Sequence, residues 1–377
     1  MKAGWKSNKL SELCEVFADG DWVESKDQSP DGIRLIQTGN VGQGVFKDRG
    51  EKARYISEAT FQRLRCTEIF EGDCLVSRLP DPAGRSCLLP DTGERMITAV
   101  DCTIVRFKRD QVMPEFFNYY SQSCEYLKGV DSETTGTTRK RISRSKLGDV
   151  VIPFPPIPEQ QRIVGVLDET FEGIATAKDN TEKNLQNARA LFDSHLNGID
   201  AEKVPLGDLV KITTGKLDAN AAVEGGKYPF FTCSREIYAI DTFAFDCEAI
   251  LLAGNNAVGD FNVKHYNGKF NAYQRTYVIT VNEQQRVLYR FLYYQMLKSL
   301  KKFKEQSVGA GTKFLKLGMI KDMEIALPSL DEQELIVSTM DSLLEETKNL
   351  ESIYQQKLSA LDALKKSLLD QAFTGQL

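Results

Sequence analysis

The sequence predicts an α+β protein made of two copies of one unit. Each unit is a mixed α/β domain followed by a long helix, and the two helices are expected to pair as an antiparallel coiled coil. Residues 142–168 match residues 315–341 at a constant offset of 173, and self-similarity at a fixed period indicates a duplicated structural unit. Each matched stretch leads into about 40 residues whose apolar side chains recur every three or four positions, a spacing typical of coiled coils.

The composition bounds the class of protein. The chain has 377 residues, 41% of them hydrophobic and 27% charged, which suggests two or three ordinary globular domains and argues against disorder. No run of 18 apolar residues and no apolar leader segment occurs, so we expect no membrane span and a cytoplasmic protein. The eight cysteines form no C-x-x-C pair, and His195 and His265 are the only histidines. A disulfide framework or a metal site is therefore not expected.

The net charge of −5 is unevenly distributed along the chain. Residues 1–150 are balanced, and residues 201–330 carry +4, while residues 151–200 and 331–377 together carry −9. The distribution matters more than the total for binding to a polyanion. The acidic total therefore does not exclude a protein that binds DNA.

The repeat is clearest around the start of each helix. Eight identities at offset 173 carry it: Asp149, Ile152, Pro155, Glu159, Gln160, Ile163, Val164 and Asp168, which recur as Asp322, Ile325, Pro328, Glu332, Gln333, Ile336, Val337 and Asp341. Upstream, GDCLV at 72–76 matches CEAIL at 247–251 at offset 175, and FNYY at 117–120 matches FLYY at 291–294 at offset 174. LFDSHLNG at 191–198 matches LLDQAFTG at 368–375 at offset 177, and KLSELCEV at 9–16 matches PLGDLVKI at 205–212 more weakly. Drifting offsets are what loop insertions in a duplicated unit would produce.

The elements of each unit follow in order. Short β-rich runs such as 102–107 and 275–280 lie between Gly and Asn turns, and apolar spacing predicts helices at 114–128 and 286–304. A proline-containing segment that interrupts helical structure precedes each long helix. Acidic residues in the first turn then stabilise the helix by interacting with its dipole. The resulting boundaries are a first domain at 1–152, its helix at 153–200, a second domain at 201–327 and its helix at 328–377.

The two helices differ in length. The offset between them grows from 173 to 177, so the second helix is predicted to have four more residues, about one turn or ~6 Å. Lys178 and Glu351 interrupt the apolar seams, one in each helix. An alternative is that the stripes simply pack on a globular core, but about 40 residues exceeds the usual length of globular helices. An antiparallel pair would place the two domains near opposite ends, related by a pseudo-two-fold axis, as suits the reading of two half-sites on one duplex.

The repeated segments resemble a known family. IPFPPIPEQQRIVGVLD, IALPSLDEQELIVSTMD, the terminal LLDQAFTGQL and the earlier LFDSHLNG are similar to the repeated regions of type I restriction-modification specificity (S) subunits, over the whole chain. The resemblance implies two target-recognition domains, each followed by a conserved helix, in a non-catalytic subunit. Such a subunit recognises an asymmetric, bipartite site in double-stranded DNA and directs adenine methylation and restriction by its partners.

The resemblance also implies the partners and the cofactors. Two modification (methyltransferase) subunits and two restriction (motor-nuclease) subunits are expected, and S-adenosylmethionine, ATP and Mg²⁺ would be used by them rather than by this chain. The P-x-x-E-Q entries and the F-T-G ending imply partner contacts at Glu159, Gln160, Glu332, Gln333, Phe373 and Gly375. The first helix ends in HLNG where the second has AFTG, so the contact at that end is expected to differ between copies.

Known catalytic motifs are missing from the sequence. N-P-P-Y, D-P-P-Y, G-x-G-x-x-G and G-x-x-x-x-G-K-[ST] do not occur, and we therefore predict no catalytic residue. Two alternatives stay open: a coiled-coil structural or interaction protein, which would lack salt-dependent DNA binding, and the specificity subunit of a methylation-only system.

Candidate DNA contacts follow from charge and position. The run 137–146 concentrates Arg139, Lys140, Arg141, Arg144 and Lys146 before the first helix, and clustered cations can neutralise phosphates and release counterions. Lys302 and Lys313 are the sparser candidates of the second copy. Base reading needs donors and acceptors on loops, and the candidates of that kind are Gln37, Thr38, Asn40, Arg78, Arg85, Asn255, Asn256 and Arg275. A turn or surface role is the competing interpretation for each of them. If the assignment holds, Arg85→Ala relaxes sequence choice, whereas Lys140→Ala weakens binding to all sequences.

Overall fold

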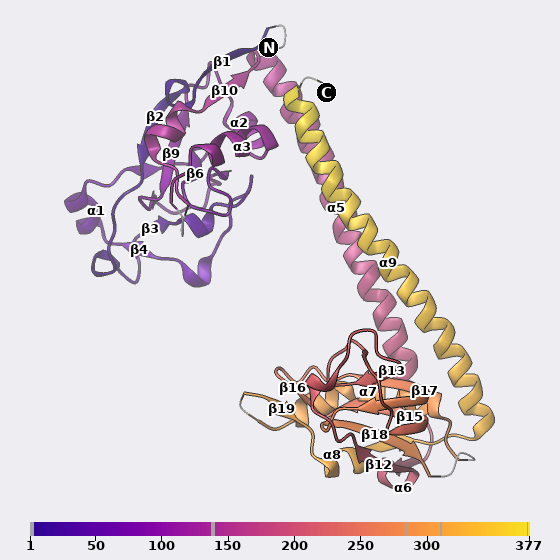
Figure 1. Ribbon diagram of the computed structural model, residues 1–377. Coiled ribbons are helices and arrows are strands. Elements are labelled where there is room, and N and C mark those ends of the chain that lie inside the picture. The colour runs from indigo at the N-terminus through magenta and orange to yellow at the C-terminus, as the bar shows by residue number, and fades with distance from the viewer. Residues whose placement is uncertain (1–3, 137–139, 283–285, 310, 375) are drawn as a thin grey trace. The chain divides into compact units, whose positions relative to one another are not determined.

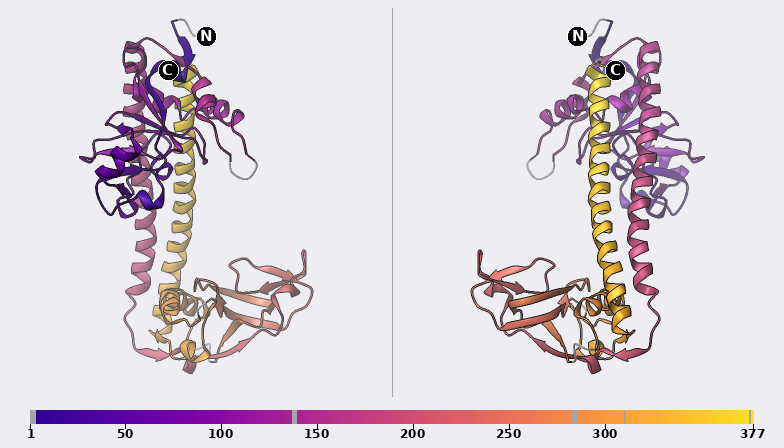
Figure 2. Two further views of the ribbon diagram at one scale, coloured as in Figure 1. Left: turned by 90° about the vertical axis from the view of Figure 1, so that its left-hand side faces the viewer. Right: turned by 90° about the vertical axis from the view of Figure 1, so that its right-hand side faces the viewer.

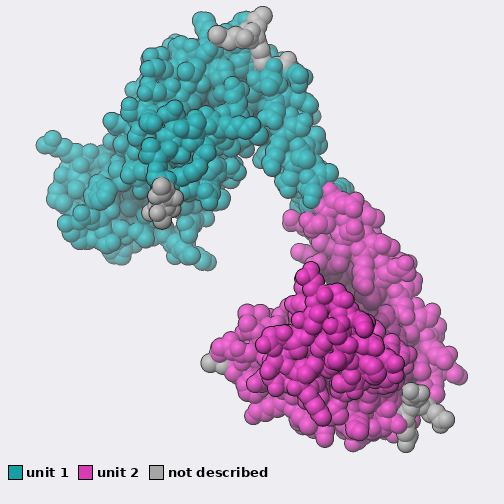
Figure 3. All heavy atoms as spheres, viewed as in Figure 1, with its two compact units in different colours: residues 1–180, 357–377 teal, residues 181–356 magenta. Residues whose placement is uncertain are grey.

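The computed structural model describes residues 4–136, 140–282, 286–309, 311–374 and 376–377. It contains two compact units, one made of residues 1–180 with 357–377 and the other of residues 181–356 (Figure 3). Each long helix contributes a part to each unit. The first is unit 1 and the second is unit 2.

Unit 1 has two four-stranded sheets, ordered β2-β9-β6-β7 and β4-β3-β8-β5, and a two-stranded pair of β1 with β10 (Figure 1). Its strands are β1 (Lys6–Lys9), β2 (Cys14–Asp19), β3 (Ile33–Ile36), β4 (Tyr55–Ile56), β5 (Glu68–Ile69), β6 (Cys74–Ser77), β7 (Ser86–Leu88), β8 (Met96–Thr98), β9 (Cys102–Phe107) and β10 (Val151–Phe154). Its short helices are α1 (Glu58–Leu64), α2 (Pro114–Tyr120), α3 (Cys124–Ser132) and α4 (Arg144–Asp149), with 3-10 turns η1 (Leu10–Leu13), η2 (Ser25–Asp27), η3 (Thr38–Asn40) and η4 (Gly50–Lys52).

Unit 2 has one six-stranded sheet, ordered β12-β18-β15-β17-β13-β14, and two-stranded pairs of β11 with β20 and of β16 with β19. Its strands are β11 (Lys203–Pro205), β12 (Val210–Thr214), β13 (Tyr228–Phe231), β14 (Tyr238–Ile240), β15 (Phe245–Ala253), β16 (Asn255–Asn256), β17 (Val263–Ala272), β18 (Thr276–Val281), β19 (Lys313–Phe314) and β20 (Glu324–Ala326). Its helices are α6 (Leu206–Leu209), α7 (Tyr289–Gln306) and α8 (Leu317–Lys321), with the 3-10 turn η5 (Ala219–Ala221).

The two units are copies of one fold. Both begin with a strand that pairs antiparallel with the strand before the long helix, β1 with β10 and β11 with β20. The amide of Leu10 then donates to the carbonyl of Val150 over 2.9 Å, and that of Leu206 donates to Met323 over 2.8 Å. These equivalent bonds confirm the weak match between residues 9–16 and 205–212.

One of the sequence offsets is wrong by one residue. Helices α2 and α7 begin at Pro114 and Tyr289, which gives 175 rather than 174. A four-letter match inside an aromatic helix slips easily by one position, because neighbouring residues are of the same kind.

The core of each unit forms between a sheet and the helices that follow it. In unit 1, Val76 and Val105 of the sheet pack against Phe117 of α2 and Val130 of α3. In unit 2, the buried aliphatic face of β15 and β18 packs against Phe291, Leu292 and Met296 of α7. The periodicity of the sequence predicts α7 because its apolar residues point to the sheet. The single helix expected at 114–128 is wrong: residues 121–123 divide it into α2 and α3, and Ser123 caps the start of α3.

The long helices are α5 (Ile157–Asn197), with 41 residues, and α9 (Leu330–Thr374), with 45. The difference of four residues confirms the prediction. In both units the two helices run antiparallel beside each other (Figure 2). Lys365 of α9 lies over the ring of Phe171 in unit 1, while Met340 of α9 packs with Phe192 and Leu196 of α5 in unit 2.

The two charges that interrupt the apolar seams are paired across the helices. Lys178 forms an ion pair with Asp362 in unit 1, and Glu351 forms one with Arg189 in unit 2, at 2.7 Å. A charge at a seam position is tolerated because its partner lies on the facing helix. Such pairs fix the register of a coiled coil more than they stabilise it.

Candidate nucleic-acid interface

Two equivalent hairpins carry the candidate DNA contacts. In unit 1, Thr135 and Arg141 exchange backbone hydrogen bonds of 2.8 and 2.9 Å. In unit 2, Val308 and Phe314 exchange bonds of 2.9 and 3.2 Å. An offset of 173 relates both pairs, and it also relates Lys140 to Lys313. Both lysines are DNA contacts predicted from the sequence, and the structure places them at the same position of the duplicated fold.

Each hairpin is anchored on the loop that follows a central strand. The amide of Ile142 donates to the carbonyl of Arg78 over 3.2 Å, and the amide of Leu315 donates to Gly254 over 2.9 Å. The equivalent bonds fix each hairpin beside the end of β6 or β15. The loops singled out from the sequence therefore do meet the basic segments in space.

In unit 2 this junction brings four predicted residues together. Strands β16 and β19 pair Asn256 with Lys313 and Asn255 with Phe314, while the carbonyl of Arg275 accepts a hydrogen bond from Gly254. The Oδ1 atom of Asn256 accepts bonds from the amides at positions 258 and 260, so its side chain shapes the turn. Asn255 is half-exposed and Arg275 is exposed, and both remain predicted base contacts.

Arg85 has a structural role that the sequence prediction missed. Its guanidinium donates to four carbonyl oxygens, those of Thr38 (2.9 Å), Val41 (2.7 Å), Leu79 (2.6 Å) and Pro82 (3.0 Å). The residue is 9% exposed, and burial lowers the pKa of the guanidinium. The prediction that Arg85 reads bases is therefore corrected: the side chain ties the 37–41 loop to the 79–85 loop.

Burial also corrects the assignments of Arg78 and Asn40. Arg78 is 4% exposed, donates to the carbonyl of Val100 and pairs with Asp19 at 3.2 Å. The Nδ2 atom of Asn40 donates to Lys47, and its Oδ1 atom accepts from the amide of Gln37. These side chains form hydrogen bonds that stabilise the loops from their buried side. A donor that is buried and already bonded is not available to bind a base. Gln37 and Thr38, which are half-buried, remain predicted contacts.

The basic run of unit 1 is paired with carboxylates. Within the described part of the run, which leaves out Arg139, every cation lies near an acid: Lys140 with Asp131 (2.8 Å), Arg141 with Asp101 (2.8 Å), Arg144 with Asp19 (3.9 Å) and Lys146 with Glu133 (3.0 Å). These pairs are exposed, so each contributes only about 0–1 kcal/mol. A phosphate would have to compete with the carboxylates for these cations.

Lys304 belongs to the same lysine run of α7 as Lys302, and it lies close to Lys313. A Cβ atom added at Gly259 would lie 3.3 Å from Cγ of Lys304 and 3.5 Å from Cγ of Lys313, so both lysines flank this glycine. Lys302, the α7 lysine chosen from the sequence, instead lines pockets beside α7. The spacing of lysines along α7 could not distinguish Lys302 from Lys304. The position of the hairpin beside the helix determines which of the two lies close to Lys313.

Gln160 and Gln333, predicted to contact partner subunits, are fully buried within their own units. The Nε2 atom of Gln160 donates to the carbonyls of Gln111 and Pro155, both at 2.8 Å, and its Oε1 atom accepts from the amide of Met113. Gln333 makes the same three bonds, to Arg286 and Pro328 and from Leu288, all at 2.9 Å. These interactions, which we call the glutamine latches, tie the first turn of each long helix to the domain before it. The partner assignment of both residues is thus wrong.

The remaining predicted partner contacts have mixed outcomes. Phe373 is buried against Phe116 and Tyr120, at ring distances of 5.4 and 5.2 Å, so its role is also internal. Glu159 pairs with Arg162 at 2.8 Å. Glu332 accepts hydrogen bonds from Ser329, which lower the pKa of its carboxyl. Glu159 and Glu332 remain predicted contacts, and Gly375 lies outside the described residues.

The described residues contain no cluster of three or more His, Cys, Asp or Glu side chains that could hold a metal ion. They also contain no helix long and apolar enough to cross a membrane. All eight cysteines are free thiols.

Comparisons with known proteins agree on one family. The sequence profile described as "Type I restriction modification DNA specificity domain" matches residues 2–187 and 199–359. The type I restriction enzyme EcoDI specificity subunit of Escherichia coli is 42% identical over 179 residues, a match that covers 48% of this chain and 39% of that protein. The putative type I restriction enzyme MjaX specificity subunit of Methanocaldococcus jannaschii is 21% identical over 411 residues, which covers 99% of this chain and 93% of that protein.

Solved structures show the same fold. A chain from a study of "complex assembly" and "conformational transition of the type I R-M system" aligns with a TM-score of 0.79 at 18% identity, covering 100% of this chain and 99% of that chain. The HsdS subunit from Thermoanaerobacter tengcongensis aligns with a TM-score of 0.58 at 18% identity, covering 100% and 98%. With two family matches that follow the duplicated units, the chain belongs to the family of DNA specificity subunits of type I restriction-modification systems.

Proposed function

We propose that this chain is a non-catalytic subunit that reads an asymmetric, bipartite DNA site, one half with each unit. The observation that carries the proposal is the pair of equivalent hairpins with unlike side chains. Arg141 of unit 1 corresponds to Phe314 of unit 2, and β16, which pairs with the second hairpin, presents Asn255 and Asn256. One scaffold with two different contact sets would read two different half-sites.

The proposed partners are modification and restriction subunits, two of each, and S-adenosylmethionine, ATP and Mg²⁺ would be used by them. Exposed large apolar side chains on the long helices support a partner surface, because such residues usually become covered by another chain. They are Leu191 on α5 and Leu335, Leu350, Ile353 and Leu364 on α9. The complex would act in the cytoplasm, where host DNA is methylated.

The first experiment maps methylated adenines. The chain is expressed with its modification subunit in a host that lacks adenine methylation, and the genome is sequenced by a method that detects N6-methyladenine. We expect one gapped, bipartite motif that disappears when this chain is left out. Absence of any chain-dependent motif, with the modification subunit shown to be active on another specificity subunit, would refute the proposal.

The second step assigns each half of the motif to a unit. Asn255→Ala should relax one half of the motif and leave the other unchanged. Arg141→Ala, at the equivalent hairpin of unit 1, should affect only the other half. If either substitution relaxed both halves of the motif, the assignment of one half-site to each unit would be contradicted.

A further inference from the structure

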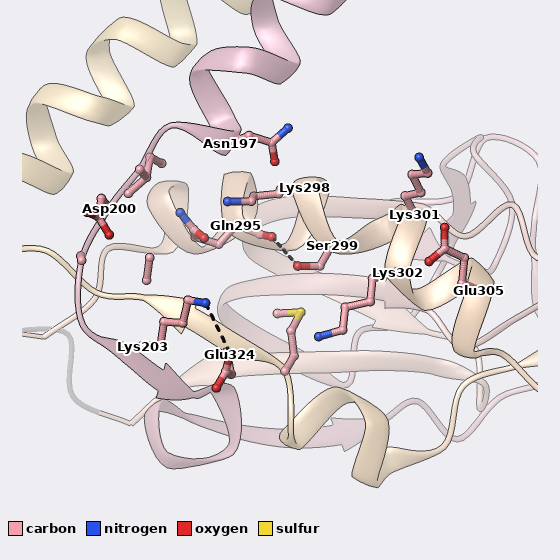
Figure 4. Close-up of a pocket in the computed structure, with 14 residues that line it drawn as sticks. Asn197, Asp200, Lys203, Gln295, Lys298, Ser299, Lys301, Lys302, Glu305 and Glu324 are labelled. Atoms are coloured by element: carbon pink, nitrogen blue, oxygen red, sulfur yellow. Dashed lines mark hydrogen bonds and ion pairs between the residues drawn. The ribbon is translucent and has the colours of Figure 1, made fainter.

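Unit 2 contains a lysine-lined pocket that includes no residue of the hairpin at 308–314. It has a volume of about 610 Å³, within the range of small-ligand sites. The segment after α5, the strands β11 and β20, and helix α7 form its walls (Figure 4). Lys203, Lys298, Lys301 and Lys302 line it, together with the carboxylates of Asp200, Glu305 and Glu324.

One face of α7 supplies the polar groups of this pocket. Lys298 and Ser299 lie three and four residues after Gln295, and Lys302 lies four and three residues after them, so the four residues share a face of the helix. Figure 4 shows Lys302 from α7 and Lys203 from β11 reaching into the space between these elements, while Lys301 points away. Within the described residues, Lys298 and Lys302 form no ion pair, whereas Lys203 lies 3.8 Å from Glu324.

Gln295 provides an independent sign of a missing ligand. Its side chain lines the pocket and is 3% exposed, yet its Nε2 atom has no hydrogen-bond acceptor in the described part of the chain. A buried amide group without a partner costs about 1–3 kcal/mol. An acceptor that entered from the pocket would remove that cost, and the neighbouring ammonium groups favour an acceptor with negative charge.

The duplication supplies an internal control for this interpretation. The equivalent hollow in unit 1 lies beside Tyr120, the counterpart of Gln295, and is lined by Glu125, Glu133 and Asp149 with Lys146 as its one lysine. Lys146 is already paired with Glu133 at 3.0 Å. The fold therefore does not require a basic pocket at this place, and the lysines and the unpaired amide belong to the second copy alone.

We propose that this pocket binds an oxyanion, a phosphate group, held by Lys298 and Lys302 and by the amide of Gln295. Ammonium and amide groups of this kind donate charge-assisted hydrogen bonds to the oxygens of a phosphate group. The phosphate could belong to a small phosphorylated molecule or to the backbone of a bound duplex.

The test measures binding of inorganic phosphate and of pyrophosphate to the full chain by titration calorimetry at low ionic strength. Lys298→Gln/Lys302→Gln should weaken binding at least tenfold, and Gln295→Met should weaken it several-fold. Lys211→Gln, an exposed lysine on β12 outside the pocket, should leave it unchanged while removing the same charge. Thermal unfolding of each variant checks that unit 2 is intact.

Two results would overturn the proposal. One is wild-type protein that binds neither anion at 10 mM, a concentration that would largely fill a site with a dissociation constant of about 1 mM. The other is equal loss of binding in the Lys211 and Lys298/Lys302 variants, which would indicate a diffuse charge effect. A duplex without the methylation motif serves as competitor: displacement of bound phosphate assigns the phosphate to the DNA backbone, and its retention assigns it to a small molecule. The site can exist whether or not the chain reads DNA, so failure here leaves the proposed function untouched.

Discussion

Lys140 and Lys313 occupy the same position in two copies of one hairpin, but among the described residues only Lys140 forms an ion pair. Asp131 lies 2.8 Å from Lys140, and no ion pair is formed by Lys313 within the described residues. The two equivalent lysines should therefore contribute unequally to binding of a duplex, even though the backbone presents them in the same way.

Lys313→Gln should weaken binding to all duplex sequences and reduce the slope of log K against log salt concentration by about 0.9, because one phosphate contact is lost. Lys140→Gln should change the slope less, since Asp131 already competes for this cation. Fluorescence anisotropy across a salt series measures both slopes. Asp131→Asn is the matched control and should strengthen binding by freeing Lys140; weaker binding in that variant would contradict the role of the pair.

Gln160→Met should destabilise unit 1, and Gln333→Met should destabilise unit 2, each by about 2–4 kcal/mol. Each substitution leaves three buried backbone groups without their hydrogen-bond partner. Hydrogen exchange followed by mass spectrometry should show faster exchange around residues 113–120 in the first variant and around 288–296 in the second. Glu159→Gln, next to the first latch but in an exposed ion pair, should change exchange very little.

Arg85→Ala should lower the stability of unit 1 by about 3 kcal/mol or more, because four carbonyl groups of two loops lose a charged donor. Its effect on DNA should be a loss of affinity for every sequence rather than a relaxed choice of bases. Chemical denaturation combined with the methylation map distinguishes these outcomes. Arg141→Ala, which removes an exposed pair, should cost less than about 1 kcal/mol. A stable Arg85→Ala protein with a relaxed motif would restore the base-reading assignment.

Asp21 makes the stability of unit 1 depend on pH. Burial raises the pKa of its carboxyl from 3.8 to about 6, against the smaller opposing effect of hydrogen bonds from Thr67 and Cys66. The carboxyl of Asp21 therefore binds its proton more tightly in the folded state than in the unfolded state. The contribution of this proton to the free energy of unfolding is lost as pH rises from about 4 to about 6.

Asp21→Asn should remove this contribution, because an amide keeps an oxygen for the amide of Thr67 without carrying a charge. The difference in unfolding free energy between the variant and the wild type should grow in favour of the variant from pH 4 to pH 7. Urea unfolding at several pH values measures it, with unit 1 followed by tryptophan fluorescence, since both tryptophans of the chain, Trp5 and Trp22, belong to unit 1. A difference that stays constant with pH would show that Asp21 titrates normally.

The extra turn of α9 leads to a prediction about the DNA site. If helix length sets the distance between half-sites, deletion of residues 345–348 should shorten the unspecified spacer of the methylated motif by a base pair or so. Four residues span ~6 Å of helix, and one base-pair step rises ~3.4 Å. Replacing the same four residues by alanine keeps the length and should keep the spacer. An unchanged spacer after the deletion would refute the idea that helix length is the determinant.

The large-scale organisation could be predicted from the sequence, because it depends on patterns that extend over many residues. The repeat, the two helices and their difference of four residues all follow from such patterns. The seam charges at Lys178 and Glu351 were visible as interruptions, but their partners were not, since register between distant helices is not a local property.

The candidate site was harder to predict, because burial of a polar loop residue depends on how the loop folds back. Arg85 and Asn40 have the composition of base-reading residues, yet neighbouring carbonyls take up their donors. Gln160 lies in the first turn of a long helix, where a polar side chain is usually exposed. Only the strand end and the helix start that converge on it make it a core residue.

The glutamine latches bond only to main-chain atoms, and this has a consequence for how the two copies have diverged. The residues that meet them have changed between the copies, from Gln111 to Arg286 and from Met113 to Leu288, while every hydrogen bond is retained. Because the bonds go to main-chain atoms, the attachment of each long helix to its domain does not depend on which side chains that domain carries at these positions. Mutations can therefore accumulate in one reading surface without loosening its attachment, and a new target sequence can arise in one half of the protein while the other half stays as it was.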